Sequence, residues 1–191
     1  MAQNLQADAA VQPLGLLAHS RLPGALESIA IAGAIETAHE HGASPLLRGL
    51  DEAEFAALLD TLFPGARAAK ALSVARGQAV ADEDLDVEFD DLLALLMAAA
   101  VRPGPGARWL ACAVASAALY DNHLWQDLRL PERRALSELL AANFPALAAR
   151  NTGNMRWKAF FYKQLCDQAG MVCRSPSCGA CDDYHECFGP E

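Results

Sequence analysis

Apolar side chains recur at three- and four-residue spacing along most of this chain, and no stretch of any length alternates between apolar and polar residues. The first spacing puts apolar side chains on one face of an α-helix, whereas a half-buried strand requires the alternation. The helical spacing is found at residues 24–42, 51–65, 81–101, 107–128, 131–144 and 154–168. We therefore predict an all-α fold, a compact helical domain.

Residues at the ends of these segments also favour helices. Asp51 and Glu54 have the spacing of a capping box, in which each side chain accepts a hydrogen bond from the other residue's backbone N–H. Gly42 and Gly170 stand where a helix would stop, and Pro131 stands where the helix over 131–144 would begin. The side chains expected to face the core are Phe55, Leu58, Leu59, Leu62, Phe89, Leu92, Leu93, Leu96, Leu136, Leu139, Leu140, Phe144, Trp157, Phe161 and Leu165.

One segment should be more buried than the others. From Trp109 to Tyr120 the chain is uncharged and rich in small residues, which predicts a helix enclosed by its neighbours. Cys112 lies in this segment and is interpreted as a small core hydrophobe. The apolar run from Trp109 to Leu119 is shorter than the roughly 20 residues that a membrane span needs.

Composition limits the class of protein. The 191 residues, 53% hydrophobic and 20% charged, suffice for one packed core. We expect a loose leader at residues 1–22, a helical domain at 23–170 and a cysteine-rich loop at 171–191. The N-terminus lacks the basic start and apolar block of a secretory signal, which predicts a cytoplasmic protein. A net charge of -9 argues against nucleic acid or an anionic membrane as a partner.

Four of the six cysteines crowd into the C-terminal residues, with the spacing C-x4-C-x2-C-x5-C. In a reducing cytoplasm such a cluster is expected to bind metal rather than to form disulfides. Gly179 allows the chain to bend so that its two flanking cysteines can face one centre. We expect the whole segment to be a loop arranged around the ligands Cys173, Cys178, Cys181 and Cys187.

The spacing leaves the metal open. The first three cysteines have the C-x4-C-x2-C spacing of plant-type ferredoxins, whereas zinc sites usually combine two C-x2-C pairs a dozen or more residues apart. We therefore favour an iron–sulfur cluster over zinc, with a disulfide as the third alternative. Positive charge nearby would favour thiolates, although for any single basic residue a place on a solvated helix face is the favoured interpretation. These residues are Arg156, Lys158, Lys163 and Arg174.

Three further residues are considered but are not included in the ligand set. Cys166 is placed at the rim of the site or in the core, with the core favoured. His185 could ligate metal or donate a hydrogen bond to a sulfur atom. His123, alone after the buried segment, is interpreted as structural.

The segment DNHLWQDLRLPERRALSELLAANFPALAARNTGNMRWKAFFYKQLC, followed by CRSPSCGACDDYHECFGPE, resembles the NifQ family of nitrogen-fixation proteins. The resemblance covers roughly residues 105–191 and is diffuse before them. It implies a protein that carries an iron–sulfur cluster, or a molybdenum–iron–sulfur species, held by Cys173, Cys178, Cys181 and Cys187. It also implies that the protein donates molybdenum to the iron–molybdenum cofactor of nitrogenase, with the cofactor-assembly scaffold and the nitrogenase iron protein as partners.

Such a protein would be a metallocluster carrier rather than a conventional enzyme, and no nucleotide-binding or hydrolase motif contradicts this. Molybdate is a hard oxyanion, so a carrier has to exchange oxygen ligands for softer sulfur. Arg174 and Lys163 are the side chains that we expect to attract it. An iron–sulfur electron-transfer protein and a zinc-stabilised interaction module remain the alternatives.

Overall fold

The computed structural model describes residues 12–68, 83–171 and 184–189. Within these residues the chain forms helices and turns and no strand, which confirms the all-α prediction. The longer helices are α1 (Leu26–Glu40), α2 (Glu52–Leu62), α4 (Glu83–Ala98), α5 (Pro105–Ala118), α7 (Arg133–Asn143) and α9 (Trp157–Gln168). The short ones are η1 (Leu16–His19), η2 (Ala66–Ala68), α6 (Leu124–Asp127), α8 (Pro145–Ala148) and α10 (Tyr184–Phe188).

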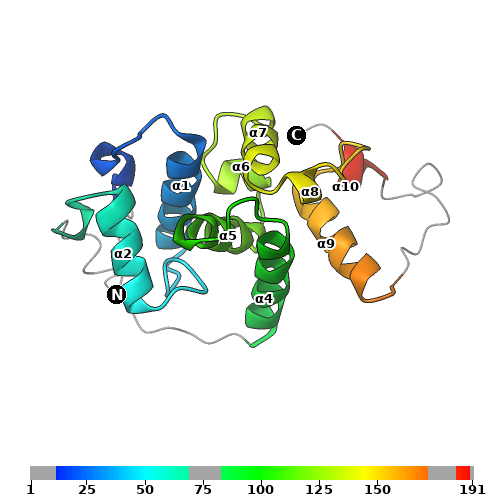
Figure 1. The fold of residues 1–191 in the computed structure, drawn as a ribbon, viewed down its shortest axis with the longest axis horizontal. Coiled ribbons are helices and arrows are strands. Elements are labelled where there is room, and N and C mark those ends of the chain that lie inside the picture. Colours follow the sequence, from blue (N-terminus) through cyan, green and yellow to red (C-terminus); the bar gives the residue numbers. More distant parts are fainter. Residues whose placement is uncertain (1–11, 69–82, 172–183, 190–191) are drawn as a thin grey trace, which may run out of the picture.

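Helix α5 lies at the centre of the molecule, between α1 and α4 (Figure 1). Every side chain from Trp109 to Ala118 is buried, so the prediction that this segment is the most enclosed is confirmed. Small residues allow α1 and α4 to approach the central helix closely, which is why a helix without a polar face is stable here. Cys112 has no solvent exposure and is part of this core.

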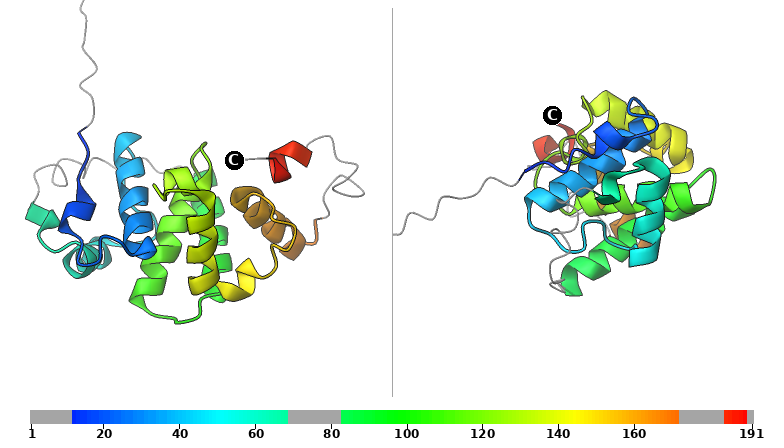
Figure 2. Two further views of the ribbon diagram at one scale, coloured as in Figure 1. Left: turned by 90° about the horizontal axis from the view of Figure 1, so that it is seen from above. Right: turned by 90° about the vertical axis from the view of Figure 1, so that its left-hand side faces the viewer.

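The remaining helices extend the molecule in two directions from α5. Helix α2 lies at one end of the longest axis, and α9 and α10 lie at the other (Figure 1). The view from above shows α10 close to α9, although residues 172–183 separate them in sequence (Figure 2). Helix α10, which carries Cys187, therefore lies at the α9 end of the molecule.

Most of the predicted helix ends are confirmed. Asp51 Oδ1 accepts from the Glu54 N–H at 2.7 Å, and Glu54 Oε2 accepts from the Asp51 N–H at 3.1 Å. Gly42 and Gly170 follow α1 and α9 with φ of 66° and 70°, a backbone region in which glycine avoids the strain of a Cβ.

Two helix starts differ from the prediction. Helix α7 begins at Arg133 after the N-cap Glu132, so Pro131 precedes the helix instead of opening it. Helix α9 begins at Trp157 rather than near Asn154, because Asn154 takes a left-handed φ of 54° that interrupts helical geometry.

The inward faces agree with the periodicity, because every side chain expected to face inward is buried or packed against the core. Phe55, Leu62, Leu93 and Leu165 are only partly buried, whereas Leu95 and Gln164, which were not singled out, lie in the interior. The helical period alone gives the direction of a face to within about one residue, and the neighbouring helices decide the rest.

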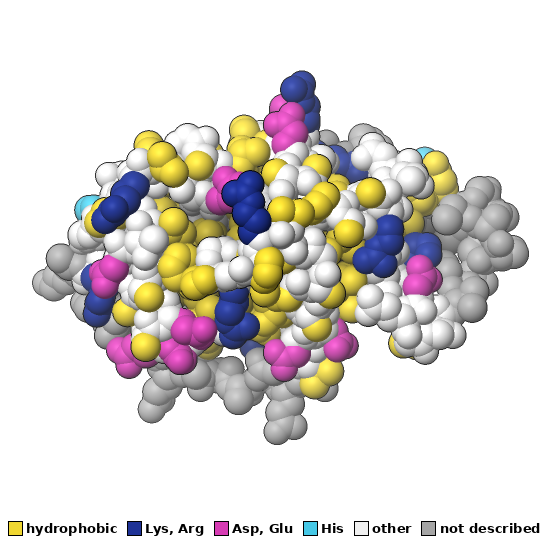
Figure 3. Space-filling view, in the orientation of Figure 1, with side chains coloured by type: hydrophobic (Ala, Val, Ile, Leu, Met, Phe, Trp, Pro, Cys, Tyr) yellow, Lys and Arg dark blue, Asp and Glu magenta, His cyan; other side chains and the backbone are white. Residues whose placement is uncertain are grey.

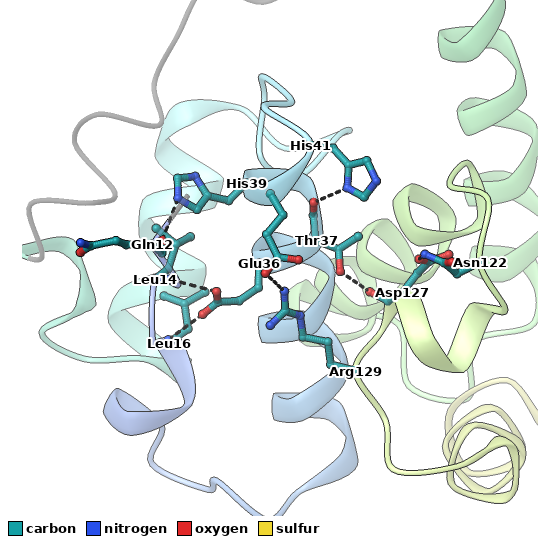
Figure 4. Close-up of polar contacts among 11 residues, drawn as sticks. Gln12, Leu14, Leu16, Glu36, Thr37, His39, His41, Asn122, Asp127 and Arg129 are labelled. Carbon is teal, nitrogen blue, oxygen red and sulfur yellow. Dashed lines mark hydrogen bonds and ion pairs between the residues drawn. The ribbon is translucent and has the colours of Figure 1, made fainter. Parts of the chain in front are cut away.

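Within residues 12–22 of the expected leader, two side chains pack against the core, whereas most of the others are exposed. Leu14 and Leu16 are buried, and both donate their backbone N–H groups to the buried carboxylate of Glu36, at 2.9 and 3.2 Å (Figure 4). A buried carboxylate needs such donors. Residues 1–11 lie outside the described part of the chain.

No helix in the described ranges combines the length and the apolar character that crossing a bilayer requires.

Candidate metal centre

The structure places one of the four predicted ligands on a defined element. Cys187 is half-buried on α10, so residues 184–188 form a short helix where the sequence predicted a loop throughout. Cys173, Cys178 and Cys181 lie outside the described residues, as does Arg174. In the described ranges no three His, Cys, Asp or Glu side chains come together as a metal site. The convergence of the four thiols therefore stays a prediction.

Helix α10 is held mainly through its backbone. The Arg156 N–H donates to the Cys187 carbonyl at 2.7 Å, and the Arg156 guanidinium donates to the carbonyls of Glu186 and Gly189, both at 3.3 Å. The Glu186 carboxylate lies 3.8 Å from the same guanidinium. Arg156 therefore holds the last turn of the chain against the start of α9.

Two glycines make this close approach possible. A Cβ at Gly189 would lie 2.4 Å from the His185 carbonyl oxygen and 2.9 Å from Arg156 Nη2. A Cβ at Gly153 would lie 3.3 Å from the Phe188 ring, which also stacks on Tyr184 at 4.8 Å between ring centroids. Any larger residue at position 189 would push α10 away from Arg156.

Helix α10 packs against the 151–156 loop, which connects α8 to α9. Asn151 closes this loop by accepting from the Met155 N–H at 2.8 Å and donating to the Met155 carbonyl at 2.9 Å. From α7, Arg133 Nη2 donates to the carbonyls of Asn154 and Met155 at 2.8 and 2.9 Å. These contacts fix the backbone from which Arg156 reaches α10.

A buried ion pair fastens α9 to the centre of the molecule. Lys158 Nζ lies 2.7 Å from Asp127 Oδ2 and also donates to the Tyr120 carbonyl at the end of α5. Asn122 donates to the other Asp127 oxygen at 3.0 Å, and Thr37 of α1 donates to the Asp127 carbonyl at 3.0 Å (Figure 4). The Asp127 side chain is 1% exposed and that of Lys158 19%.

Burial also shifts the pKa values of Lys158 and of the neighbouring Tyr120. Desolvation lowers the pKa of Lys158, and the hydrogen bond and charge of Asp127 oppose that shift. Burial raises the pKa of Tyr120, while Arg48 lowers it and Asp127 raises it. The Asp127 carboxylate therefore matters for the charge state of its surroundings as well as for packing.

The comparisons with known proteins concern the same region. The NifQ family model matches residues 29–189, which contain most of α1, the buried ion pair, the 151–156 loop and all four clustered cysteines. This chain is a member of the NifQ family. No solved structure matches it significantly.

Individual relatives agree with the family match. The chain is 46% identical over 155 residues to Protein NifQ of Azotobacter vinelandii, covering 77% of this chain and 80% of the relative. It is 42% identical over 144 residues to Protein NifQ of Rhodobacter capsulatus, covering 75% and 76%. A Protein NifQ homolog of Sinorhizobium fredii is 43% identical over 143 residues, covering 74% of this chain and 60% of the relative.

The other thiols of this NifQ family member differ in their surroundings. Cys112 is in the core, and burial raises the pKa of its thiol to about 11, with a smaller opposing effect of Arg108. It is therefore a neutral core side chain at physiological pH, as the sequence predicted. Cys166 is half-buried near the end of α9, between the rim and core alternatives.

The histidines and basic residues also take defined places. His123 is the N-cap of α6, where its backbone N–H donates to Gln126 Oε1 at 3.1 Å. His185 is exposed on α10. Lys163 donates to Asp167 at 2.6 Å, so a neighbouring carboxylate compensates its charge. Lys and Arg side chains are visible over α9 in the space-filling view (Figure 3).

Sequence reasoning missed the structural roles of Arg156, Asp127 and Lys158. In the sequence the basic residues indicate either charge near the thiols or a solvated helix face, whereas the structure shows Arg156 binding backbone carbonyls and Lys158 binding a buried carboxylate. A signal was present, because Asn154, Gly153 and Gly189 are turn-forming residues that mark a tightly folded junction. Their partners cannot be found from local spacing.

Proposed function

We propose that this protein is a metallocluster carrier that takes up molybdenum and delivers it to assembly of the iron–molybdenum cofactor of nitrogenase. The observation that carries the proposal is a family match over residues 29–189, a range that includes most of the described helices and all four clustered cysteines. Nitrogen fixation is the process to which the family resemblance assigns such a protein. A cytoplasmic location and the absence of conventional catalysis belong to the same proposal.

The residues present fit an iron–sulfur cluster. Thiolates are the donors that such clusters use, and their softness also suits molybdenum once its oxygen ligands are exchanged for sulfur. Cys187, half-buried on an element that is held to the core, is a suitable ligand position. Cys173, Cys178 and Cys181 would complete the set. The cluster would supply the sulfur-rich environment in which molybdenum is carried.

The protein's own residues bind and present the cargo. Cys187 lies on α10, at the α9 end of the molecule and away from the α2 end (Figure 1), and the other three thiolates would hold the cargo together with it. A terminal position leaves room for acceptors, which we propose to be the cofactor-assembly scaffold together with the nitrogenase iron protein. Asp167 compensates the charge of Lys163, which weakens the attraction of this side chain for the oxyanion, and Arg174, the other expected attractor, lies outside the described residues.

Anaerobic purification tests the proposal. The wild-type protein from cells supplied with molybdate is expected to be coloured, to contain iron and molybdenum, and to give an electron paramagnetic resonance signal of an iron–sulfur species. Cys178→Ala should lose most of the iron and the signal, whereas Cys112→Ala should retain both because Cys112 lies in the core.

Other results would contradict the proposal in distinguishable ways. A colourless protein with zinc and no iron would indicate an interaction module. Iron with a reversible one-electron couple but no molybdenum would indicate electron transfer. Full iron and molybdenum loading of Cys178→Ala would refute the ligand assignment.

A further inference from the structure

Cys187 differs from a ligand on an unsupported loop because its backbone is already bound to the helical core. Its carbonyl accepts from the Arg156 N–H at 2.7 Å, and the carbonyls before and after it, at Glu186 and Gly189, accept from the Arg156 side chain. One residue thus contacts three carbonyls within the last turn of the chain. Contacts to the backbone fix the position of α10 regardless of which side chains it carries.

The support for Arg156 is equally specific. Its own backbone belongs to the 151–156 loop, which Asn151 closes from within and Arg133 holds from α7. The following residue, Trp157, donates from Nε1 to Ser137 Oγ at 3.1 Å, a second link to α7. Continuous contacts therefore link Cys187 to the core. Helix α7 holds the 151–156 loop, and Arg156 at the end of this loop binds α10.

We propose that Arg156 is a positioning residue that holds Cys187 on the core as a preset ligand, so that the cluster assembles onto a thiol whose place is fixed before metal arrives. The ligand role of Cys187 rests on the proposed function, whereas the docking of α10 by Arg156 does not. Presetting a ligand reduces the conformational entropy lost on metal binding. Supporting residues of this kind typically change metal affinity by about 10- to 100-fold when they are replaced.

Arginine is suited to this role in a way that lysine is not. The planar guanidinium presents several N–H donors in a fixed arrangement, and here Nε and Nη1 reach two different carbonyls. A lysine would keep the positive charge but has a single donor atom. Comparison of the two residues therefore separates the carbonyl contacts from a general effect of charge on the thiolates.

The first measurement is amide hydrogen exchange, residue by residue, on the full-length apoprotein under reducing conditions. In wild-type protein the amides of residues 156 and 189, which donate to the Cys187 and His185 carbonyls, should be protected. Arg156→Ala and Arg156→Lys should lose this protection at α10 while α5 stays protected. Arg134→Ala is the matched control, since Arg134 is an exposed arginine paired with Glu138 on α7.

The second measurement is the rate at which an iron(II) chelator removes iron from the anaerobically reconstituted protein. Both Arg156 variants should release iron about tenfold faster than wild type, and Arg134→Ala should not differ from wild type. Gly189→Ala should reproduce the effect with Arg156 intact, because its Cβ would collide with the His185 carbonyl. This last variant keeps the test decisive if Arg156→Ala folds poorly.

If Arg156→Ala showed the same amide exchange and the same rate of iron release as wild type, the inference would be overturned. The inference would also be overturned if Arg156→Lys matched wild type in both measurements while Arg156→Ala did not, because the positive charge alone would then explain the effect. Wild-type protein that binds no iron would refute the proposed function and the ligand role of Cys187, while the exchange measurement would still decide whether Arg156 docks α10.

Discussion

Replacement of Asp127 by alanine is expected to destabilise the fold by about 3–5 kcal/mol. The substitution would leave the Lys158 ammonium in a partly buried site without its carboxylate partner, and would also remove the acceptor for Asn122. A buried charge without a partner costs far more than the pair itself contributes, since desolvation is no longer offset. Urea unfolding of the apoprotein, followed by far-ultraviolet circular dichroism, measures the change in the free energy of unfolding.

Two further variants identify the cause of that loss. Asp127→Ala combined with Lys158→Met should recover much of the stability, because no unpaired charge remains. Glu138→Ala removes the exposed partner of Arg134 and should have little effect. If Asp127→Ala alone changed the free energy of unfolding by less than about 1 kcal/mol, the ion pair would not be what holds α9 to the centre of the molecule.

Gly33→Ala is expected to destabilise the protein by about 2–3 kcal/mol, although alanine is the better helix former. Gly33 lies inside α1, where helix propensity alone predicts a gain of about 1 kcal/mol from alanine. A Cβ at this position, however, would lie 2.1 Å from the Leu128 carbonyl oxygen and 2.4 Å from its carbon. Backbone atoms cannot move aside as a flexible side chain can, so the steric term decides the sign.

Gly106→Ala is the matched control, because Gly106 lies in the first turns of α5 and a Cβ there would meet nothing within 4 Å. This variant should be neutral or slightly more stable than wild type. Both variants can be compared in urea or by their thermal midpoints as apoproteins. Equal effects at the two positions would contradict the close approach of α1 to the end of α6.

Local patterns account for the helices and several of their ends. The capping box at Asp51 and Glu54 depends on residues three apart, and the stops at Gly42 and Gly170 depend on one residue's backbone freedom. The short helices α8 and α10 were not predicted, since four or five residues are too few for a periodic pattern, and α6 was expected as part of one helical segment over 107–128 instead of a separate helix after α5. Tertiary contacts hold them in place instead.

The candidate metal centre is likewise only partly predictable from local sequence patterns. The spacing of the four cysteines is visible in the sequence and suggests the chemistry of a thiolate site. The placement of Cys187 on a docked helix is not visible there, because it depends on Arg156, which is separated from the contacted carbonyls by 30 and 33 residues. Asp127 and Lys158 are likewise 31 residues apart.

By itself, the amino-acid sequence determined that this chain forms amphipathic helices around a small-residue core and carries four closely spaced thiols near its end. These features follow from composition and from spacing over a few residues. Only the tertiary structure decided that Gly33 meets a backbone carbonyl, that Lys158 is neutralised by Asp127, and that Arg156 fastens α10. Steric exclusion, charge burial and backbone hydrogen bonds act between atoms that are close in space, whatever their separation along the chain.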